Sequence, residues 1–182
     1  PGPRLPHDMA VSENYTILHD FPLWPDADAL KLGRYKVRFH PDQPSRFAVV
    51  PRHGQASEIQ WFTASPTYML HVVNAWEEGR EVVMVGTPYR IHEDADGQLD
   101  ARRLERTINQ RQRDFLLKEW RFNLDTGQTT ERVIDDVLNT EFQLINSAYQ
   151  GRKNRWTYNV LFPQGGREEP RFPGLVKYDL ET

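Results

Sequence analysis

Cysteine is absent from this chain of 182 residues, and its absence excludes disulfide bonds, thiolate metal ligands and a cysteine nucleophile. No apolar run approaches the roughly 20 residues of a membrane-spanning helix, and no signal peptide is visible. The net charge of −3 provides no strong attraction to nucleic acid, so a nucleic-acid partner is not expected. These absences favour a cytoplasmic protein with enough residues for one well-packed domain.

Aromatic residues, by contrast, are frequent at 12% of the chain, and short β-forming runs alternate with turn residues. We predict strands at residues 14–19, 46–50, 58–62, 68–75, 81–86, 115–123, 129–134, 155–162 and 174–179, with turns at 51–54, 78–79, 125–127 and 165–166. Many short strands joined by hairpins predict an all-β sandwich, barrel or propeller. A weak recurrence of strand, Asp-x-x turn and strand favours the propeller.

Two segments depart from this pattern. Residues 21–33 place apolar side chains between prolines and acids, which predicts either an apolar lip on the surface or a loop packed on its own core. Residues 99–112 predict one short inserted helix, with Leu104 and Ile108 four positions apart on one face. Its arginines lack interleaved aromatic residues, so a solvated helix face is favoured over nucleic-acid binding.

Several common functional motifs are missing. Residues 94–100 (DADGQLD) resemble part of a calcium loop, but His92 and Arg103 stand where that loop needs acids. A polar loop is therefore expected there. Neither a glycine-rich phosphate loop nor a nucleophile elbow is present, so phosphate chemistry and serine hydrolysis have no support.

Histidine is the only abundant source of borderline-soft metal ligands. His53 and His92 lie in polar turns and are expected at the surface, His40 opens a loop before Pro41, and a surface pairing is expected for His19 at the end of its strand.

His7 and His71 differ from these four. His71 lies within an apolar, β-forming run at residues 68–79 (YMLHVVNAWEEG), and His7 lies in the motif-like stretch 6–15. A buried imidazole needs a hydrogen-bond partner or a metal. Taken singly, each histidine is more often structural; together the two segments suggest a metal site spread over several strands.

Three blocks of the sequence carry a resemblance to a known family. The blocks are residues 7–15 (HDMAVSENY), residues 71–78 (HVVNAWEE), and residues 139–146 (NTEFQLIN) followed by 149–153 (YQGRK). In order, they resemble the His-Asp-Phe-Ala-x-Thr-Glu-x-Tyr, His-x-x-Asn-Ala-Trp/Tyr-Glu and Glu-Phe-Pro-x-Ile-Asn blocks of the carotenoid cleavage oxygenases. That superfamily includes the retinal pigment epithelial membrane protein and lignostilbene dioxygenase. Gln143 stands where the family often has proline.

The resemblance implies a seven-bladed β-propeller with a non-haem Fe(II) ion, Fe2+, held by four histidines and braced by glutamates. Carried over residue by residue, His7 and His71 match two ligands and Glu141 matches a brace. We therefore expect the two imidazoles to converge and Glu141 to accept a hydrogen bond from His71. The family's first ligand is expected before Pro1 and its last beyond Thr182.

The implied activity is cleavage of a conjugated C=C bond of a carotenoid or apocarotenoid by O2, giving aldehyde or ketone products. The implied partners are an apolar polyene and O2, with peripheral contact to a membrane that supplies the substrate. Trp61, Phe62, Tyr68 and Trp76 are expected in the core or along a substrate tunnel. The alternatives are a stilbene-type double-bond dioxygenase and a non-catalytic ligand-binding propeller.

Both ends of the chain predict a fragment. The sequence opens Pro-Gly-Pro without methionine, and residues 176–182 stop where a hairpin like that at 120–129 turns. We therefore expect residues 1–182 to be an incomplete propeller domain, truncated at both ends, that binds iron weakly and is inactive by itself.

Overall fold

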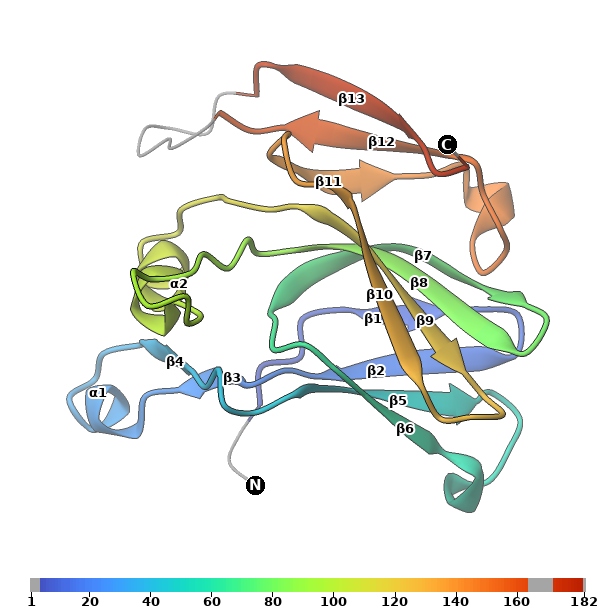
Figure 1. The fold of residues 1–182 in the computed structure, drawn as a ribbon, viewed down its shortest axis with the longest axis horizontal. Helices are drawn as coiled ribbons and strands as arrows, with labels where there is room; N and C mark the ends of the chain where they lie inside the picture. Colours follow the sequence, from blue (N-terminus) through green and yellow to red (C-terminus); the bar gives the residue numbers. More distant parts are fainter. Residues whose placement is uncertain (1–3, 164–171, 182) are drawn as a thin grey trace.

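The computed structural model describes residues 4–163 and 172–181, and the turn expected at 165–166 lies outside them. Three antiparallel sheets are stacked on one another (Figure 1). The first has the strand order β1-β2-β5-β6 and comprises β1 (Met9–Val11), β2 (Tyr15–Asp20), β5 (Ser45–Pro51) and β6 (Gln60–Ala64). The mostly β structure confirms the predicted all-β class.

The other two sheets follow along the chain. The second, ordered β10-β9-β8-β7, comprises β7 (Met69–Glu78), β8 (Glu81–Pro88), β9 (Leu117–Asn123) and β10 (Thr129–Asp135). The third is β11 (Thr140–Leu144), β12 (Trp156–Leu161) and β13 (Gly174–Asp179). Neighbouring strands are consecutive within their sheet except for β2 and β5, which are separated by β3, α1 and β4 (residues 23–39), and the connection from β8 to β9 contains the helix at residues 101–109. At the β7–β8 turn Gly79 has a φ of 60°, a left-handed conformation that favours glycine.

The second sheet is covered on both faces. Val82 and Met84 belong to the core shared with the first sheet, whereas Val83 and Val85 belong to a smaller cluster that packs against Tyr178 and other residues of the third-sheet region. Side chains alternate between faces along a strand, so a doubly covered strand needs apolar residues at every position. This explains why β8 reads as a continuous apolar run.

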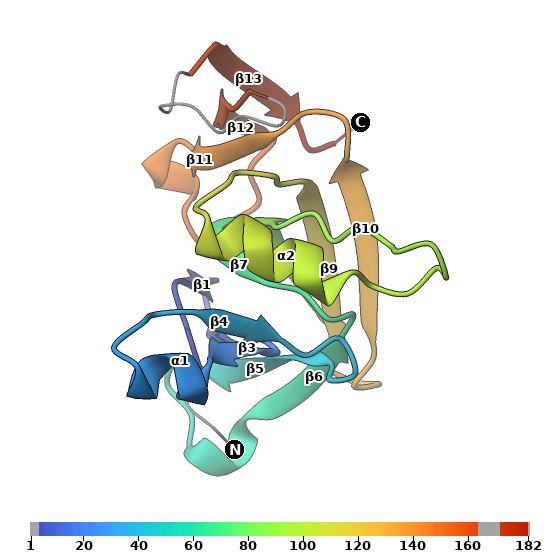
Figure 2. The same cartoon turned by 90° about the vertical axis from the view of Figure 1, so that its left-hand side faces the viewer.

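Helices and short strands occupy one end of the stack (Figure 2). The helix predicted at 99–112 is α2 (Ala101–Asn109). Its buried Leu104 faces the core, and Ile108 packs beside it. Glu105 of α2 accepts a hydrogen bond of 3.0 Å from the backbone N–H of Phe39, which connects the helix to the short strand at residues 37–39.

The prediction of a single helix is wrong, because the segment 21–33 contains a second one. This segment forms β3 (Leu23–Pro25) and α1 (Ala27–Lys31), and β3 pairs with β4 (Val37–Phe39). Both predicted alternatives hold in part: Phe21 and Leu23 are buried, whereas Leu30 and Leu32 are exposed. Two single-turn 3-10 helices, η1 (Ala56–Glu58) and η2 (Ser147–Tyr149), complete the described elements.

Candidate metal centre

His7 and His71 come from different sheets and meet in space. His7 lies just before β1, and His71 is the third residue of β7. Their ring centroids are 5.0 Å apart, with the ring planes at 80°. The side chain of His71 is 33% exposed and His7 is exposed, so the burial expected for His71 is only partial. The ring instead opens onto the space that it shares with His7.

The hydrogen bonds of the two rings assign their tautomers. Nδ1 of His7 lies 3.0 Å from the carbonyl oxygen of Leu70, and a carbonyl only accepts, so this nitrogen carries the ring proton. Nδ1 of His71 lies 2.7 and 2.9 Å from the two carboxylate oxygens of Glu141. With the proton on Nδ1, the neutral form of an imidazole has its lone pair on Nε2, and this is the form that binds a metal ion.

Glu141 is almost completely buried, with 1% of its surface exposed. It accepts hydrogen bonds from His71, from the hydroxyl of Thr87 at 3.1 Å and from the backbone N–H of Phe142 at 2.6 Å. A buried carboxylate without such donors would be costly, whereas three donors compensate for its lost hydration.

Backbone irregularities turn these side chains toward one another. The β7–β8 register shifts between Met69 and Val72, the interval that contains His71. The β11–β12 register shifts between Glu141 and Leu144, and within this interval Phe142 has a φ of 54°. A left-handed backbone at a bulky residue costs on the order of 1–3 kcal/mol. At this position the Phe142 N–H donates to the Glu141 carboxylate.

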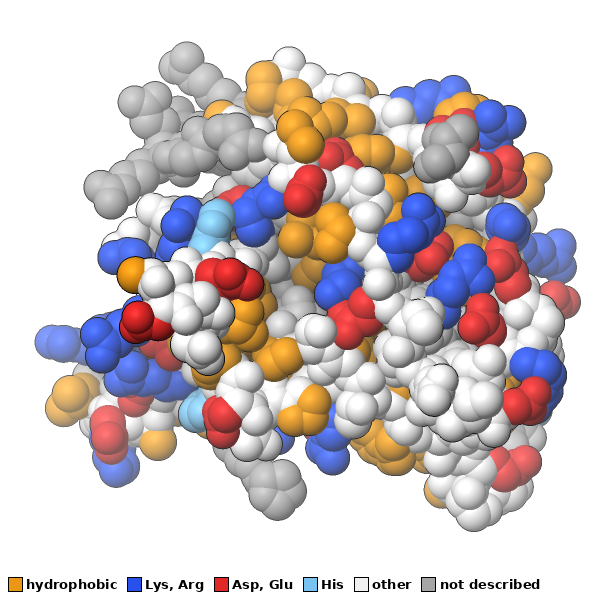
Figure 3. Space-filling view, viewed as in Figure 1, with side chains coloured by type: hydrophobic (Ala, Val, Ile, Leu, Met, Phe, Trp, Pro, Cys, Tyr) orange, Lys and Arg blue, Asp and Glu red, His pale blue; other side chains and the backbone are white. Residues whose placement is uncertain are grey.

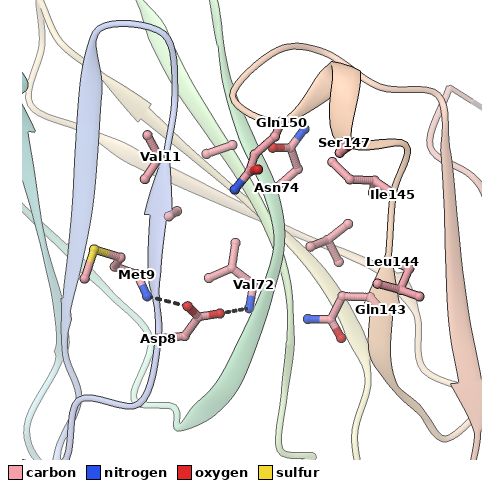
Figure 4. Close-up of a pocket in the computed structure, with 13 residues that line it drawn as sticks. Asp8, Met9, Val11, Val72, Asn74, Gln143, Leu144, Ile145, Ser147 and Gln150 are labelled. Carbon is pink, nitrogen blue, oxygen red and sulfur yellow. Dashed lines mark hydrogen bonds between the residues drawn. The ribbon is translucent and has the colours of Figure 1, made fainter.

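Asp8 connects the start of β1 to β7 beside the two histidines. Its Oδ2 accepts a hydrogen bond of 2.8 Å from the backbone N–H of Val72, and its Oδ1 accepts one of 2.8 Å from the N–H of Met9 (Figure 4). Asp8 follows His7 and Val72 follows His71, so this contact fixes the relative position of the two imidazoles.

Polar residues of the second block join the sheets further along β7. Asn74 donates from Nδ2 to the carbonyl oxygens of Tyr149 and Arg152 and to Oδ1 of Asn154, and its Oδ1 accepts from the N–H of Gly151. The block therefore contains a residue that holds the loop after β11 as well as a candidate ligand.

Glu77, in the same block, holds the turn between β1 and β2. It accepts from the Ser12 hydroxyl and from the backbone and side chain of Asn14, at distances of 2.7 to 2.8 Å. Burial opposes its ionisation, but these hydrogen bonds prevail and lower the pKa of Glu77.

His19 departs from its expected surroundings, and His40 lies outside the strands, as expected. His19 is 8% exposed rather than at the surface, and its ring packs against Phe21 and Phe47. Its expected surface pairing is wrong, because the side chain faces the core of the first sheet. His40 stacks on Trp24, with ring centroids 3.6 Å apart.

The last two histidines lie away from the pair. His53 is exposed, as expected. His92 is half-buried, and its Nε2 lies 2.9 Å from Asp114, so its expected exposure is only partly correct. Among the described residues, no group of three or more His, Cys, Asp and Glu side chains is arranged to hold a metal ion.

The aromatic residues proposed for the core or a tunnel separate into two groups. Phe62, Tyr68 and Trp76 are buried, whereas Trp61 is 56% exposed. Burial raises the pKa of the Tyr68 phenol to about 12. Three of the four are therefore core residues.

A different aromatic group, which sequence reasoning missed, adjoins the histidines. The ring of Phe142 lies 5.7 Å from that of His71 and 5.7 Å from that of Phe162, and Phe162 lies 5.2 Å from Phe172. Phe142 and Phe172 are 44% and 51% exposed. These rings form an apolar surface beside the open side of His71. Two of them lie outside the three motif blocks, and no local pattern distinguishes them from core residues.

A cavity of about 310 Å³ lies between β1, β7 and β11 (Figure 4). Its walls include Asp8 and Val72, which directly follow the two histidines in the sequence, and the side chain of Gln143. The site is thus bounded on one side by aromatic rings and on another by this mixed polar and apolar cavity.

Comparison with known proteins identifies the family. The sequence model described as "Retinal pigment epithelial membrane protein" matches residues 1–182. The chain belongs to the carotenoid cleavage oxygenase family. A carotenoid 9,10(9',10')-cleavage dioxygenase from Crocus sativus is 32% identical over 186 residues, which cover 100% of this chain and 32% of that protein. An isoeugenol monooxygenase from Pseudomonas putida is 37% identical over 78 residues, or 43% of the chain and 16% of that protein.

Solved structures of the family share the fold. The lignostilbene dioxygenase of Pseudomonas brassicacearum superposes with a TM-score of 0.74 at 25% identity, covering 100% of this chain and 39% of that one. The Synechocystis apocarotenoid oxygenase, in a Trp149Ala mutant, gives a TM-score of 0.74 at 21% identity over 37% of its length. The chain thus spans about a third of the length of the carotenoid cleavage oxygenases that it matches.

Proposed function

We propose that this chain is part of a non-haem Fe(II) dioxygenase that cleaves a conjugated C=C bond of a carotenoid or apocarotenoid. The observation that carries the proposal is the pair His7 and His71, whose ring centroids lie 5.0 Å apart and whose Nδ1 atoms both contact oxygen acceptors, which leaves Nε2 of each ring for a metal ion. Neutral imidazoles suit Fe(II). In the proposed architecture the three sheets are consecutive blades of a seven-bladed propeller, and the full-length protein provides two further histidines.

Each residue of the site has a defined task in this proposal. His7 and His71 would hold the ion, and Fe(II) when bound supplies the activation of O2 that oxidative alkene cleavage requires. Glu141 keeps His71 in the tautomer that leaves Nε2 free. Phe142 and Phe172 offer exposed ring faces beside His71, which can contact an apolar chain and exclude water from it.

A phenolic alkene of the stilbene or phenylpropene class is the second candidate substrate. The similarity to an isoeugenol monooxygenase and to a lignostilbene dioxygenase supports it. The two candidates differ in the length of the conjugated chain, so the full-length protein should be assayed with an apocarotenal, a lignostilbene and isoeugenol in parallel. Aldehyde formation from the apocarotenal supports the first candidate, and turnover of the phenolic substrates alone supports the second. Binding without turnover of any of them would favour a ligand-binding propeller.

Peripheral contact with a membrane is part of the proposal, because a polyene substrate dissolves in lipid. The described chain has no helix that is long and apolar enough to cross a membrane. One exposed apolar segment is residues 30–36, where Leu30, Leu32 and Tyr35 are exposed among basic side chains. Figure 3 shows hydrophobic and basic side chains together at the end of the molecule that carries α1. Such a surface matches the apolar interior and anionic headgroups of a lipid layer.

The proposed metal site is tested by the variant Glu141→Gln in the full-length protein. The substituted amide would face the Nδ1–H of His71 with a neutral group, so iron affinity or activity should fall about 10- to 100-fold. Iron content by elemental analysis and turnover are the measurements, with His53→Gln as a control at an exposed histidine. Unchanged iron content and turnover would exclude Glu141 as the brace, and iron binding that survives His7→Ala and His71→Ala would refute the site itself.

A further inference from the structure

Thr87, at the end of β8, lies behind the Glu141 carboxylate and is completely buried. Its hydroxyl oxygen is 3.1 Å from Oε1 of Glu141, the same oxygen that lies 2.7 Å from Nδ1 of His71. Two other oxygens lie near the Thr87 hydroxyl, the amide oxygen of Gln143 at 3.2 Å and the carbonyl oxygen of His71 at 3.5 Å. The carboxylate is the nearest and the strongest acceptor, so we assign the single hydroxyl proton to Glu141. Thr87 therefore orients the Glu141 carboxylate, and the carboxylate in turn orients the ring of His71.

Gln143 completes this arrangement. Its amide oxygen lies 3.2 Å from the Thr87 hydroxyl oxygen, and its Nε2 is buried with no hydrogen-bond partner among the described residues. With its oxygen toward Thr87, the Gln143 amide would compete with the Glu141 carboxylate for the one hydroxyl hydrogen. A half-turn of the amide exchanges its oxygen and nitrogen, so that Nε2 donates to Thr87. Amide orientation follows from such hydrogen-bond logic.

We propose that Thr87 and Gln143 are positioning residues for the metal ligand His71, acting through a directional chain in which Gln143 donates to Thr87 and Thr87 donates to Glu141. Glu141 in turn accepts the Nδ1 proton of His71. The chain restrains the carboxylate oxygen that also contacts the ring, and so fixes the ring tautomer and orientation. The role in metal binding rests on the proposed iron site, whereas the effect on the ring does not.

The matched pair Thr87→Val and Thr87→Ser in the full-length protein tests the proposal. Valine keeps the shape of threonine but removes the hydroxyl, whereas serine keeps the hydroxyl and loses a methyl group. We expect Thr87→Val to weaken Co²⁺ affinity about three- to tenfold, less than loss of the direct brace, and Thr87→Ser to retain affinity within about twofold of the parent protein. Thermal unfolding of the metal-free variants identifies any general loss of stability.

A second readout requires no metal. In metal-free protein carrying isotope-labelled histidine, the Nδ1–H resonance of His71 should be protected from solvent exchange in the parent and in Thr87→Ser. It should broaden or shift in Thr87→Val. Equal effects of valine and serine, or no effect of either, would overturn the role of Thr87. If the parent protein binds no Co²⁺, the proposed metal site fails, but the ring resonances still decide whether Thr87 positions His71.

The variant Gln143→Met tests the outer residue of the hydrogen-bond chain by itself. Methionine has a similar length and cannot donate to Thr87, so we expect the same changes as in Thr87→Val, with about a two- to threefold loss of Co²⁺ affinity. If Gln143→Met behaves like the parent in both readouts while Thr87→Val does not, the chain ends at Thr87 and the role of Gln143 is refuted.

Discussion

At the scale of single residues, His19 makes stability depend on pH. Burial lowers the pKa of its imidazole from 6.5 to about 4, against an opposing effect from the charge of Asp8. Between these values the unfolded chain binds more protons than the folded one, so stability falls as pH decreases from 6.5 towards 4. The loss attributable to His19 is about 2 kcal/mol between pH 7 and pH 5.

His19→Leu should remove that loss. Urea unfolding at pH 7 and pH 5 is the measurement, and the difference between the two pH values should be about 2 kcal/mol smaller in the variant than in the parent. His53→Gln, at an exposed position, is the control and should leave the difference unchanged. The same pH dependence in His19→Leu and the parent would show that other groups cause it.

Asn74 should be important for the loop after β11 rather than for β7 itself. Asn74→Ala removes the partners of two carbonyl oxygens and one N–H in residues 149–152, and we expect a loss of about 2–3 kcal/mol. Hydrogen exchange should become faster at residues 149–154 and stay unchanged in β8. Asn146→Ala, which removes a single exposed cap to Ala148, serves as the control and should cost about 1 kcal/mol or less.

The candidate site could be predicted only where a motif surrounds its residues. His7, His71 and Glu141 each lie within a block that resembles the family. Thr87 has no such signal, since a threonine at the end of an apolar run reads as an ordinary strand residue. Only the pairing of β8 with β7 and the irregular register beside His71 bring it to Glu141.

At the scale of secondary-structure elements, the sequence predicts the segments with a strong hydrophobic periodicity, and it does not predict the short or irregular strands. The helix expected at 99–112 forms over Ala101–Asn109, with Asp100 as its N-cap. The strands β1, β3, β4 and β11 were missed. The first three have three residues each, too few for a pattern. In β11 the bulge and the buried Glu141 interrupt the alternation that marks a strand.

The segment 30–36 yields a prediction about membranes. Leu30 and Leu32 are 46% and 72% exposed, and their transfer into a lipid layer would be favourable. The double variant Leu30→Ser and Leu32→Ser should bind vesicles containing phosphatidylserine about tenfold more weakly in a sedimentation assay. Val137→Ser, at a side chain that is 73% exposed elsewhere, is the matched control. Equal vesicle binding by all three proteins would contradict membrane contact through this segment.

At the scale of the whole molecule, the 182-residue chain should be a poor metal binder. It presents two convergent imidazoles, and its described residues include no group of three potential ligands that could hold an ion. We expect the purified chain to retain less than stoichiometric iron after desalting and to release no aldehyde from an apocarotenal. Tightly bound stoichiometric iron, measured by elemental analysis, would show that this chain contains further ligands.

The separate origins of the two imidazoles would give an ion at the proposed site a thermodynamic role. No backbone ladder joins the first and second sheets in the described chain, yet His7 precedes a strand of one and His71 belongs to the other. An ion bound to both rings is a cross-link between sheets, and at a hundred times its Kd such a ligand adds about 2.7 kcal/mol to the stability of the folded state. Because that stabilisation acts between the sheets, removal of the ion would loosen their packing against each other before either sheet unfolds.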